Sequence, residues 1–206
     1  MPIVITGQGT LSNGGTANFV SGGVTTSLSS IKVSINGGTA VEVWKKSVTC
    51  TDLVKWNGWS TQGSVNTSAE AAAGLTGIQC ISGASSVGQA VGKIYQNISM
   101  VNDHKYWLYY GTYSMDGFTV ETPLGNASYS SGTQQKSQIV TYTGTSGSKQ
   151  VAAYYSGSND TSSAYGRLCN MNIVDLTASF GAGSEPTASW CATNLGIFNG
   201  SKTVIP

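Results

Sequence analysis

Few residues in this sequence could carry out acid, base or metal chemistry. The 206 residues include nine acids and one histidine, and charged side chains make up only 9% of the chain. The single histidine, His104, cannot supply a familiar histidine-based metal site or an extended set of acids and bases. It follows Asp103 in the sequence, and we predict that it lies in a solvated turn.

Paired carboxylates are equally scarce. Glycoside hydrolysis uses two carboxyl groups about 5–9 Å apart. Five acids stand alone in predicted loops or at strand ends: Asp103, Asp116, Glu121, Asp160 and Asp175. The sequence also lacks the motifs GxSxG, GxxxxGKS/T and HExxH, and the Gly-x-Gly pairs at residues 7–9 and 181–183 lack the third glycine of a dinucleotide fingerprint. We expect no enzyme activity, no cofactor and no metal site.

The four cysteines are far apart in the sequence: Cys50, Cys80, Cys169 and Cys191. Without a CxxC pair they indicate neither a zinc knuckle nor a thioredoxin-type site. We expect buried free thiols. One or two disulfides remain the alternative, which would require an oxidising compartment.

Aromatic side chains are better suited to binding than to catalysis. Sugar rings stack on Trp and Tyr, while sugar hydroxyls need amide and hydroxyl partners, and the chain is rich in both. The candidates are two tryptophans in a polar, glycine-containing stretch and five tyrosines predicted to be exposed: Trp56, Trp59, Tyr109, Tyr113, Tyr129, Tyr154 and Tyr165. The alternative, that most of these rings fill the core or an interface between subunits, stays open.

Charge and hydropathy argue against several kinds of partner. The net charge is +1 and the ten Lys and Arg residues are scattered, so no basic surface for nucleic acid is predicted. Residues 1–5 lack the basic and long apolar segments of a signal peptide, and no stretch approaches the ~18 apolar residues of a membrane span. We expect neither nucleic-acid binding nor membrane insertion.

The elements that would position these residues are mainly strands. Gly, Ser, Thr and Asn fill the polar positions and favour turns and strands over helices. Apolar residues alternate with polar ones in residues 31–35, 41–44 and 93–100, whereas residues 105–113 are apolar on both faces, and residues 101–104 are predicted to close a hairpin. Further strands are expected at residues 117–121, 138–143, 151–155 and 167–176. This pattern predicts an all-β fold, an antiparallel β-sandwich preceded by a small N-terminal β module.

Two short helices are expected to interrupt the strands. Residues 67–74 contain good helix formers and end in Gly, so they could supply a turn or two. The second helix lies near the C-terminus, with Ser184 as its predicted N-cap and residues 187–194 as its body. It is expected to turn Trp190 and Cys191 inward.

A segment near the C-terminus carries the most distinctive pattern in the chain. Residues 175–191 are DLTASFGAGSEPTASWC, and IFNG follows at residues 197–200. This segment resembles a signature that closes many bacteriophage and prophage tail or virion proteins. There it follows the last strand of a jelly-roll domain similar to carbohydrate-binding modules. Residues 167–174 take the place of that strand, and residues 94–113 are similar to an ordered pair of central strands in that family.

The resemblance covers about residues 50–206, and more loosely residues 35–46 resemble a short element of small phage virion proteins. It implies a virion-docking module at residues 1–48 and a jelly-roll domain at residues 49–206. The implied function is a non-enzymatic virion structural protein, a head or tail decoration or fibre component. The alternative is a receptor-binding or glycan-adhesion module. Implied partners are other virion proteins, copies of itself and, in the alternative, host-surface glycans. The implied location is the surface of a particle assembled in the bacterial cytoplasm.

Overall fold

The computed structural model describes most of the chain in two units. The described residues are 17–21, 24–28, 30–33, 41–63, 65–66, 71–72, 75–76, 78–81, 92–114, 117–156 and 165–206. One unit comprises Met1–Thr49 with Thr203–Pro206, and the other comprises Cys50–Lys202. The predicted assignment of residues 1–48 and 49–206 to separate domains stays a prediction.

The first unit contains two antiparallel hairpins. β1 (Ala17–Ser21) pairs with β2 (Val24–Leu28), and β3 (Ser30–Val33) pairs with β4 (Val41–Lys45). The second hairpin confirms the two strands expected around residues 31–44, although its predicted turn lies outside the described residues. The small N-terminal β module predicted from the sequence is therefore present.

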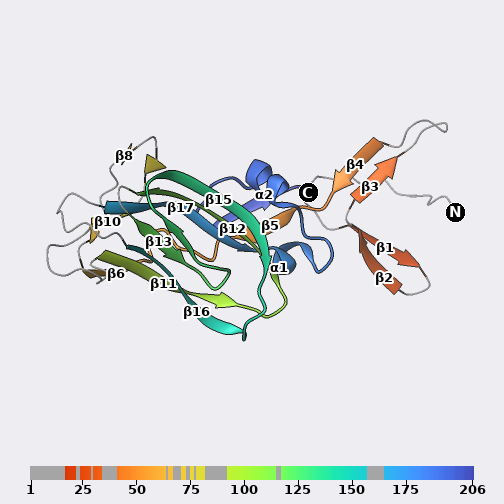
Figure 1. Ribbon diagram of the computed structural model, residues 1–206. Coiled ribbons are helices and arrows are strands. Elements are labelled where there is room, and N and C mark those ends of the chain that lie inside the picture. Colours follow the sequence, from red (N-terminus) through yellow and green to blue (C-terminus); the bar gives the residue numbers. More distant parts are fainter. Residues whose placement is uncertain are drawn as a thin grey trace. The chain divides into compact units, whose positions relative to one another are not determined.

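The second unit is an antiparallel β-sandwich of jelly-roll type (Figure 1). Its described strands form two five-stranded sheets. The first, here called the aromatic sheet, has the order β15 (Gly132–Thr141), β12 (Lys105–Ser114), β17 (Tyr165–Asp175), β10 (Ile78–Ile81) and β7 (Val65–Asn66). The second, here called the polar sheet, has the order β14 (Ala127–Tyr129), β13 (Phe118–Glu121), β16 (Gly147–Tyr155), β11 (Gly92–Met100) and β6 (Ser60–Gly63). The all-β prediction is confirmed.

Two smaller strand pairs complete the described structure. β5 (Val48–Thr51) pairs with β18 (Ser201–Val204), and β8 (Ala71–Ala72) pairs with β9 (Leu75–Thr76). The helix expected at residues 67–74 is therefore wrong at Ala71 and Ala72. The tight β8–β9 pairing competes with a helix there, and the other residues of that prediction lie outside the described ones.

The core lies between the two sheets. Because side chains alternate along a strand, β12 turns Tyr106, Leu108 and Tyr110 into the core, while β11 contributes Ile94 and Ile98. These five side chains are at most 4% exposed. The core side of each strand is thus fixed, and the alternate residues must point to the outer faces.

The prediction that β11 and β12 form a hairpin is wrong. β11 pairs with β16 and β6, whereas β12 pairs with β15 and β17. The connection at residues 101–104 therefore crosses from the polar sheet to the aromatic sheet. β11 and β12 both bury apolar side chains in the core between the sheets, but each does so from a different sheet.

Two helices follow β17 in the described part of the chain. α1 (Leu176–Phe180) begins directly after the strand, with Asp175 as its N-cap, and was not predicted. α2 (Ala188–Asn194) confirms the expected C-terminal helix, but its N-cap is Thr187 and not Ser184. Of the two side chains predicted to face inward, Cys191 is buried, whereas the indole of Trp190 packs edge-on against Phe180.

A second group of buried side chains lies outside the main core. Alternation turns Trp107 and Val174 outward from the aromatic sheet, yet both are fully buried. α1 packs against β12 and α2 packs against β15, so this helical segment covers that part of the outer face.

The described cysteines are free thiols. Cys50, Cys169 and Cys191 are buried, while the side chain of Cys80 lies outside the described residues. Burial raises the pKa of Cys169 to about 11 and that of Cys191 to about 12. These thiols therefore stay protonated at neutral pH and are poor nucleophiles.

Candidate functional site

Three of the seven predicted aromatic residues share one surface. Tyr109 and Tyr113 lie on β12 and Tyr165 lies on β17, and all three alternate with core-facing neighbours. They therefore point outward from the aromatic sheet and are half-buried. We call these three residues the tyrosine face.

Tyr113 and Tyr165 are the two members of the tyrosine face whose rings contact each other. Their ring centroids are 5.9 Å apart with an interplanar angle of 37°. The guanidinium carbon of Arg167 lies 4.9 Å from the centroid of Tyr165, and Arg167 is opposite Tyr113 in the strand register. Arg167 lies on the same outward side of β17 as Tyr165 but is only 3% exposed, so it is a buried neighbour of the Tyr165 ring.

Polar side chains of β15 run beside the tyrosine face. Ser137 is opposite Tyr109 and Thr133 is opposite Tyr113, and both β15 residues are exposed. Gln135 lies between them and is also exposed. The surface thus combines aromatic rings with hydroxyl and amide groups.

Tyr109 packs against a buried tryptophan on the same outer face of the sheet. Its ring centroid lies 5.5 Å from that of Trp107, whose indole N–H donates to the Ser137 hydroxyl over 3.1 Å. Trp107 is fully buried, so the Tyr109 ring rests on a fixed neighbour.

The other four predicted residues are placed elsewhere. Tyr129 and Trp59 pack against the core, and the Tyr129 hydroxyl bonds to that of Tyr110 over 2.9 Å. Tyr154 lies on the polar sheet and donates its hydroxyl hydrogen to Glu121. Trp56 is 36% exposed, on a loop, and its indole N–H donates to the backbone oxygen of Met171. The structure does not bring these four into one site.

The predicted candidates for ring stacking did not include Tyr95. It lies on the outward side of β11, opposite Ala152, with the Lys93 ammonium 6.0 Å from its ring centroid. The alternation of Ile94 with Tyr95 was a sufficient signal, because it places Tyr95 on the surface once Ile94 is in the core.

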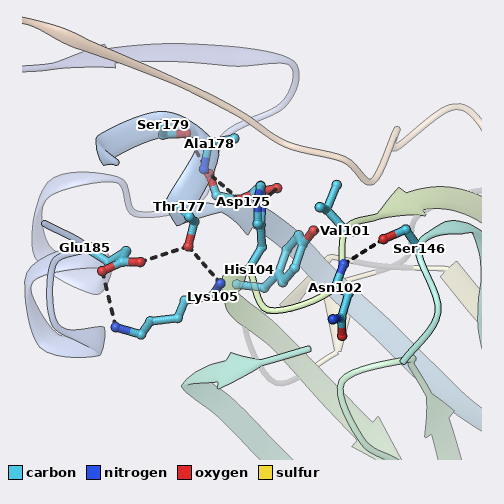
Figure 2. A network of polar contacts seen from close by, with 11 residues as sticks. Val101, Asn102, His104, Lys105, Ser146, Asp175, Thr177, Ala178, Ser179 and Glu185 are labelled. Atoms are coloured by element: carbon cyan, nitrogen blue, oxygen red, sulfur yellow. Dashed lines mark hydrogen bonds and ion pairs between the residues drawn. The ribbon is translucent and has the colours of Figure 1, made fainter. Parts of the chain in front are cut away.

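Residues 175–185 form a polar network with the start of β12 (Figure 2). His104 Nδ1 lies 2.8 Å from a carboxylate oxygen of Asp175, whose other oxygen accepts the backbone N–H of Ala178. Asp175 therefore caps α1 and holds His104 at once. The turn predicted at His104 is present, since the His104 N–H donates to the backbone oxygen of Val101, but the side chain is not solvated as expected: it is 28% exposed and bonded to Asp175. Asp175 is likewise not isolated.

Glu185 belongs to the same network and joins it to the start of β12. It accepts hydrogen bonds from the Thr177 hydroxyl over 2.8 Å and from the Lys105 ammonium over 3.2 Å, while Thr177 accepts the backbone N–H of Lys105. Hydrogen bonds from its own backbone N–H and from Thr177 hold the pKa of Glu185 at about 2. The polar groups of this segment are thus engaged in fastening it to β12.

Within the described ranges, no three His, Cys, Asp or Glu side chains converge as metal ligands would. No described helix has the length and apolar content that would let it cross a bilayer.

No protein-family model matches this sequence, and no curated protein matches it either. Among solved structures, the chain is similar to TmCBM61 in complex with beta-1,4-galactotriose, with a TM-score of 0.36 and 12% identity, over 58% of this chain and 89% of that one. It is also similar to the CBM22-1 xylan-binding domain from Paenibacillus barcinonensis Xyn10C, with a TM-score of 0.32 and 15% identity, over 62% of this chain and 92% of that one. Likenesses this distant say nothing about the ligand of this chain.

Proposed function

We propose that this chain binds carbohydrate through the tyrosine face of the aromatic sheet. The observation that supports the proposal is the Tyr113–Tyr165 pair, whose rings pack together on an outer face with Arg167 against one of them. Because their packing already restrains these rings, a ligand that stacks on them has little side-chain entropy to remove.

The chemistry of the face suits a neutral oligosaccharide. Tyr109 and Tyr113 are four residues apart on one strand, which separates them by about 13 Å along β12. That separation is longer than a single sugar ring and fits a short chain lying along the strand. The exposed side chains of Thr133 and Gln135 lie beside this track and can hydrogen-bond sugar hydroxyls.

Replacing Tyr165 with alanine is expected to weaken glycan binding by roughly tenfold or more, because it removes one ring and the neighbour against which Tyr113 packs. A glycan array with the purified full chain would identify the ligand. Calorimetric titration of wild type and Tyr165→Ala would then measure the loss.

Two further variants make this test specific. Tyr165→Phe keeps the ring and should retain most of the affinity. Tyr154→Ala makes the same kind of truncation on the polar sheet and should bind like wild type. A flat array, or an equal loss in Tyr154→Ala, would refute the proposed site.

We propose as a second function that the chain is displayed on a bacteriophage particle, with the N-terminal unit docking and the sandwich facing outward. The resemblance of residues 175–200 to a virion-protein signature supports it. Display would also multiply weak glycan binding by copy number. Both functions can hold together.

Deleting residues 1–48 is expected to leave a soluble sandwich that no longer joins the particle. Immunogold micrographs of particles assembled with full-length or truncated chain would check this. Labelled particles carrying the truncated chain would contradict the docking role, and unlabelled particles with the full chain would contradict the virion location.

A further inference from the structure

One extra residue interrupts the regular pairing of β17 with β12. The register joins Tyr109 to Asn172 and Gly111 to Cys169, so two positions along β12 correspond to three along β17. This is a β-bulge, in which one strand gains an unpaired residue. Because side chains alternate with a period of two, the side chains beyond the extra residue change faces. Bulges often lie next to functional sites, where they redirect a side chain.

The bulge decides on which face of the sheet Tyr165 lies. Asn172 is opposite the outward-pointing Tyr109, and Tyr165 is seven positions away from Asn172 along β17. Strict alternation over an odd number of positions would place these two side chains on opposite faces, so Tyr165 would point into the core. The extra residue reverses this, and Tyr165 lies on the outer face in contact with the ring of Tyr113.

Asn170 supplies the backbone conformation of the bulge. Its φ is 52°, in the left-handed region, and among the described residues other than glycine only Asp103 also has a positive φ. One common type of bulge begins with a residue in this conformation, which asparagine tolerates better than most residues with a side chain. The next residue, Met171, accepts the indole N–H of Trp56 at its backbone oxygen over 3.2 Å. A side chain from outside the strand thus also binds the bulge.

We propose that Asn170 is a positioning residue of the carbohydrate site, because its left-handed backbone holds the bulge that brings Tyr165 to the tyrosine face. The site requires the conformation of this backbone and not the amide group of the side chain. The effect on binding rests on the proposed function, whereas the contact between the Tyr113 and Tyr165 rings can be measured without a ligand.

Two substitutions at Asn170 test the role of the backbone. Glycine adopts a positive φ freely, so Asn170→Gly should keep wild-type affinity for the glycan and the contact between the two rings. Valine disfavours a positive φ and favours a regular strand, so Asn170→Val should displace the bulge and separate the rings. We expect its affinity to fall roughly tenfold, as for Tyr165→Ala. Calorimetric titration measures the affinity, and nuclear Overhauser effects between labelled tyrosine rings report the contact.

Asp103→Val is the matched control. It strains the other described residue of this kind, whose φ is 62°, in the turn that precedes β12. Its midpoint of thermal unfolding should fall about as much as that of Asn170→Val, while its glycan affinity and its ring contact stay as in wild type. Asn170→Ala strains the same backbone with a smaller side chain, and it takes the place of the valine variant if that variant does not fold.

A double variant tests whether Asn170 acts through Tyr165. If it does, Asn170→Val should cause no further loss of affinity in the Tyr165→Ala background. Additive losses would overturn the proposal. So would an Asn170→Val variant that keeps the ring contact and wild-type affinity, a loss in Asn170→Gly, or an equal loss in Asp103→Val. A wild type that binds no glycan would refute the proposed function instead, and the ring contact would still decide whether Asn170 sets the face of Tyr165.

Discussion

Replacing Gly166 with alanine is expected to destabilise the sandwich by roughly 3 kcal/mol, because the added methyl group would overlap Phe118. A Cβ at Gly166 would lie 2.6 Å from the Cγ atom and 2.8 Å from the Cβ atom of the Phe118 side chain. These atoms are close to the Phe118 backbone and cannot swing aside, and Phe118 is fully buried. Either β13 or β17 must shift, which opens the contact between the two sheets.

Gly111 provides the matched control for this substitution. It also lies in a long strand of the aromatic sheet, but a Cβ there would meet Cys169 at 3.6 Å, an ordinary contact. Gly111→Ala should therefore be neutral or stabilising by up to about 1 kcal/mol. Thermal unfolding should show a midpoint lower by roughly 6–12 °C for Gly166→Ala alone. Equal midpoints for the two variants would contradict the packing described here.

The stability of the sandwich is expected to fall as the pH rises from about 4 to about 8, because of Asp52. This carboxylate is 4% exposed and accepts the backbone N–H groups of Ile173 and Val54, and the amide of Asn172. Asn172 also donates to the backbone oxygen of Phe198 over 2.6 Å. Asp52 thus joins the loop after β5 to β17 and, through Asn172, to the C-terminal segment.

Burial raises the pKa of Asp52 from 3.8 to about 7, against the opposing effect of its three hydrogen bonds. Between pH 3.8 and about 7, the folded state therefore holds a proton on Asp52 that the unfolded state has released. The contribution of this group to stability is complete below its unfolded pKa and is lost as the pH rises through about 7. The full change in unfolding free energy is at most roughly 4 kcal/mol.

The variant Asp52→Asn isolates this effect, because it cannot titrate while every other ionisable group remains. Urea unfolding of both proteins at several pH values gives the difference between their unfolding free energies. We expect the unfolding free energy of wild type to fall relative to that of Asp52→Asn as the pH rises through about 7. Parallel pH profiles for wild type and variant would show that Asp52 does not bind the proton.

Most of the sandwich could be predicted from local patterns. The alternation in residues 93–100 and the apolar run in residues 105–113 correspond to β11 and β12, because burial on one or both faces leaves a direct mark on the sequence. The first half of β15 could not be found this way. Residues 132–137 are polar throughout, since this edge strand is exposed there on both sides.

Pairing between strands was less predictable than the strands themselves. The segment at residues 101–104 has hairpin length, yet it links two sheets, because local sequence does not encode the partner that each strand finds. The candidate site likewise depends on strand pairing that local sequence does not encode. Tyr113 and Tyr165 are 52 positions apart and meet only through the β12–β17 register, which shifts between Tyr109 and Gly111. Residue type was enough to identify both tyrosines as candidates, but it could not predict that their rings contact each other.

The measurement that tests the proposed carbohydrate site most directly is a nuclear magnetic resonance titration of isotope-labelled full chain with the best glycan from the array. We predict saturable shift changes concentrated at Tyr109, Tyr113 and Tyr165 and at the neighbouring residues of β15. The polar sheet, with Tyr95 and Tyr154, should remain unchanged. Shifts confined to the polar sheet, or none at saturating glycan, would contradict the account.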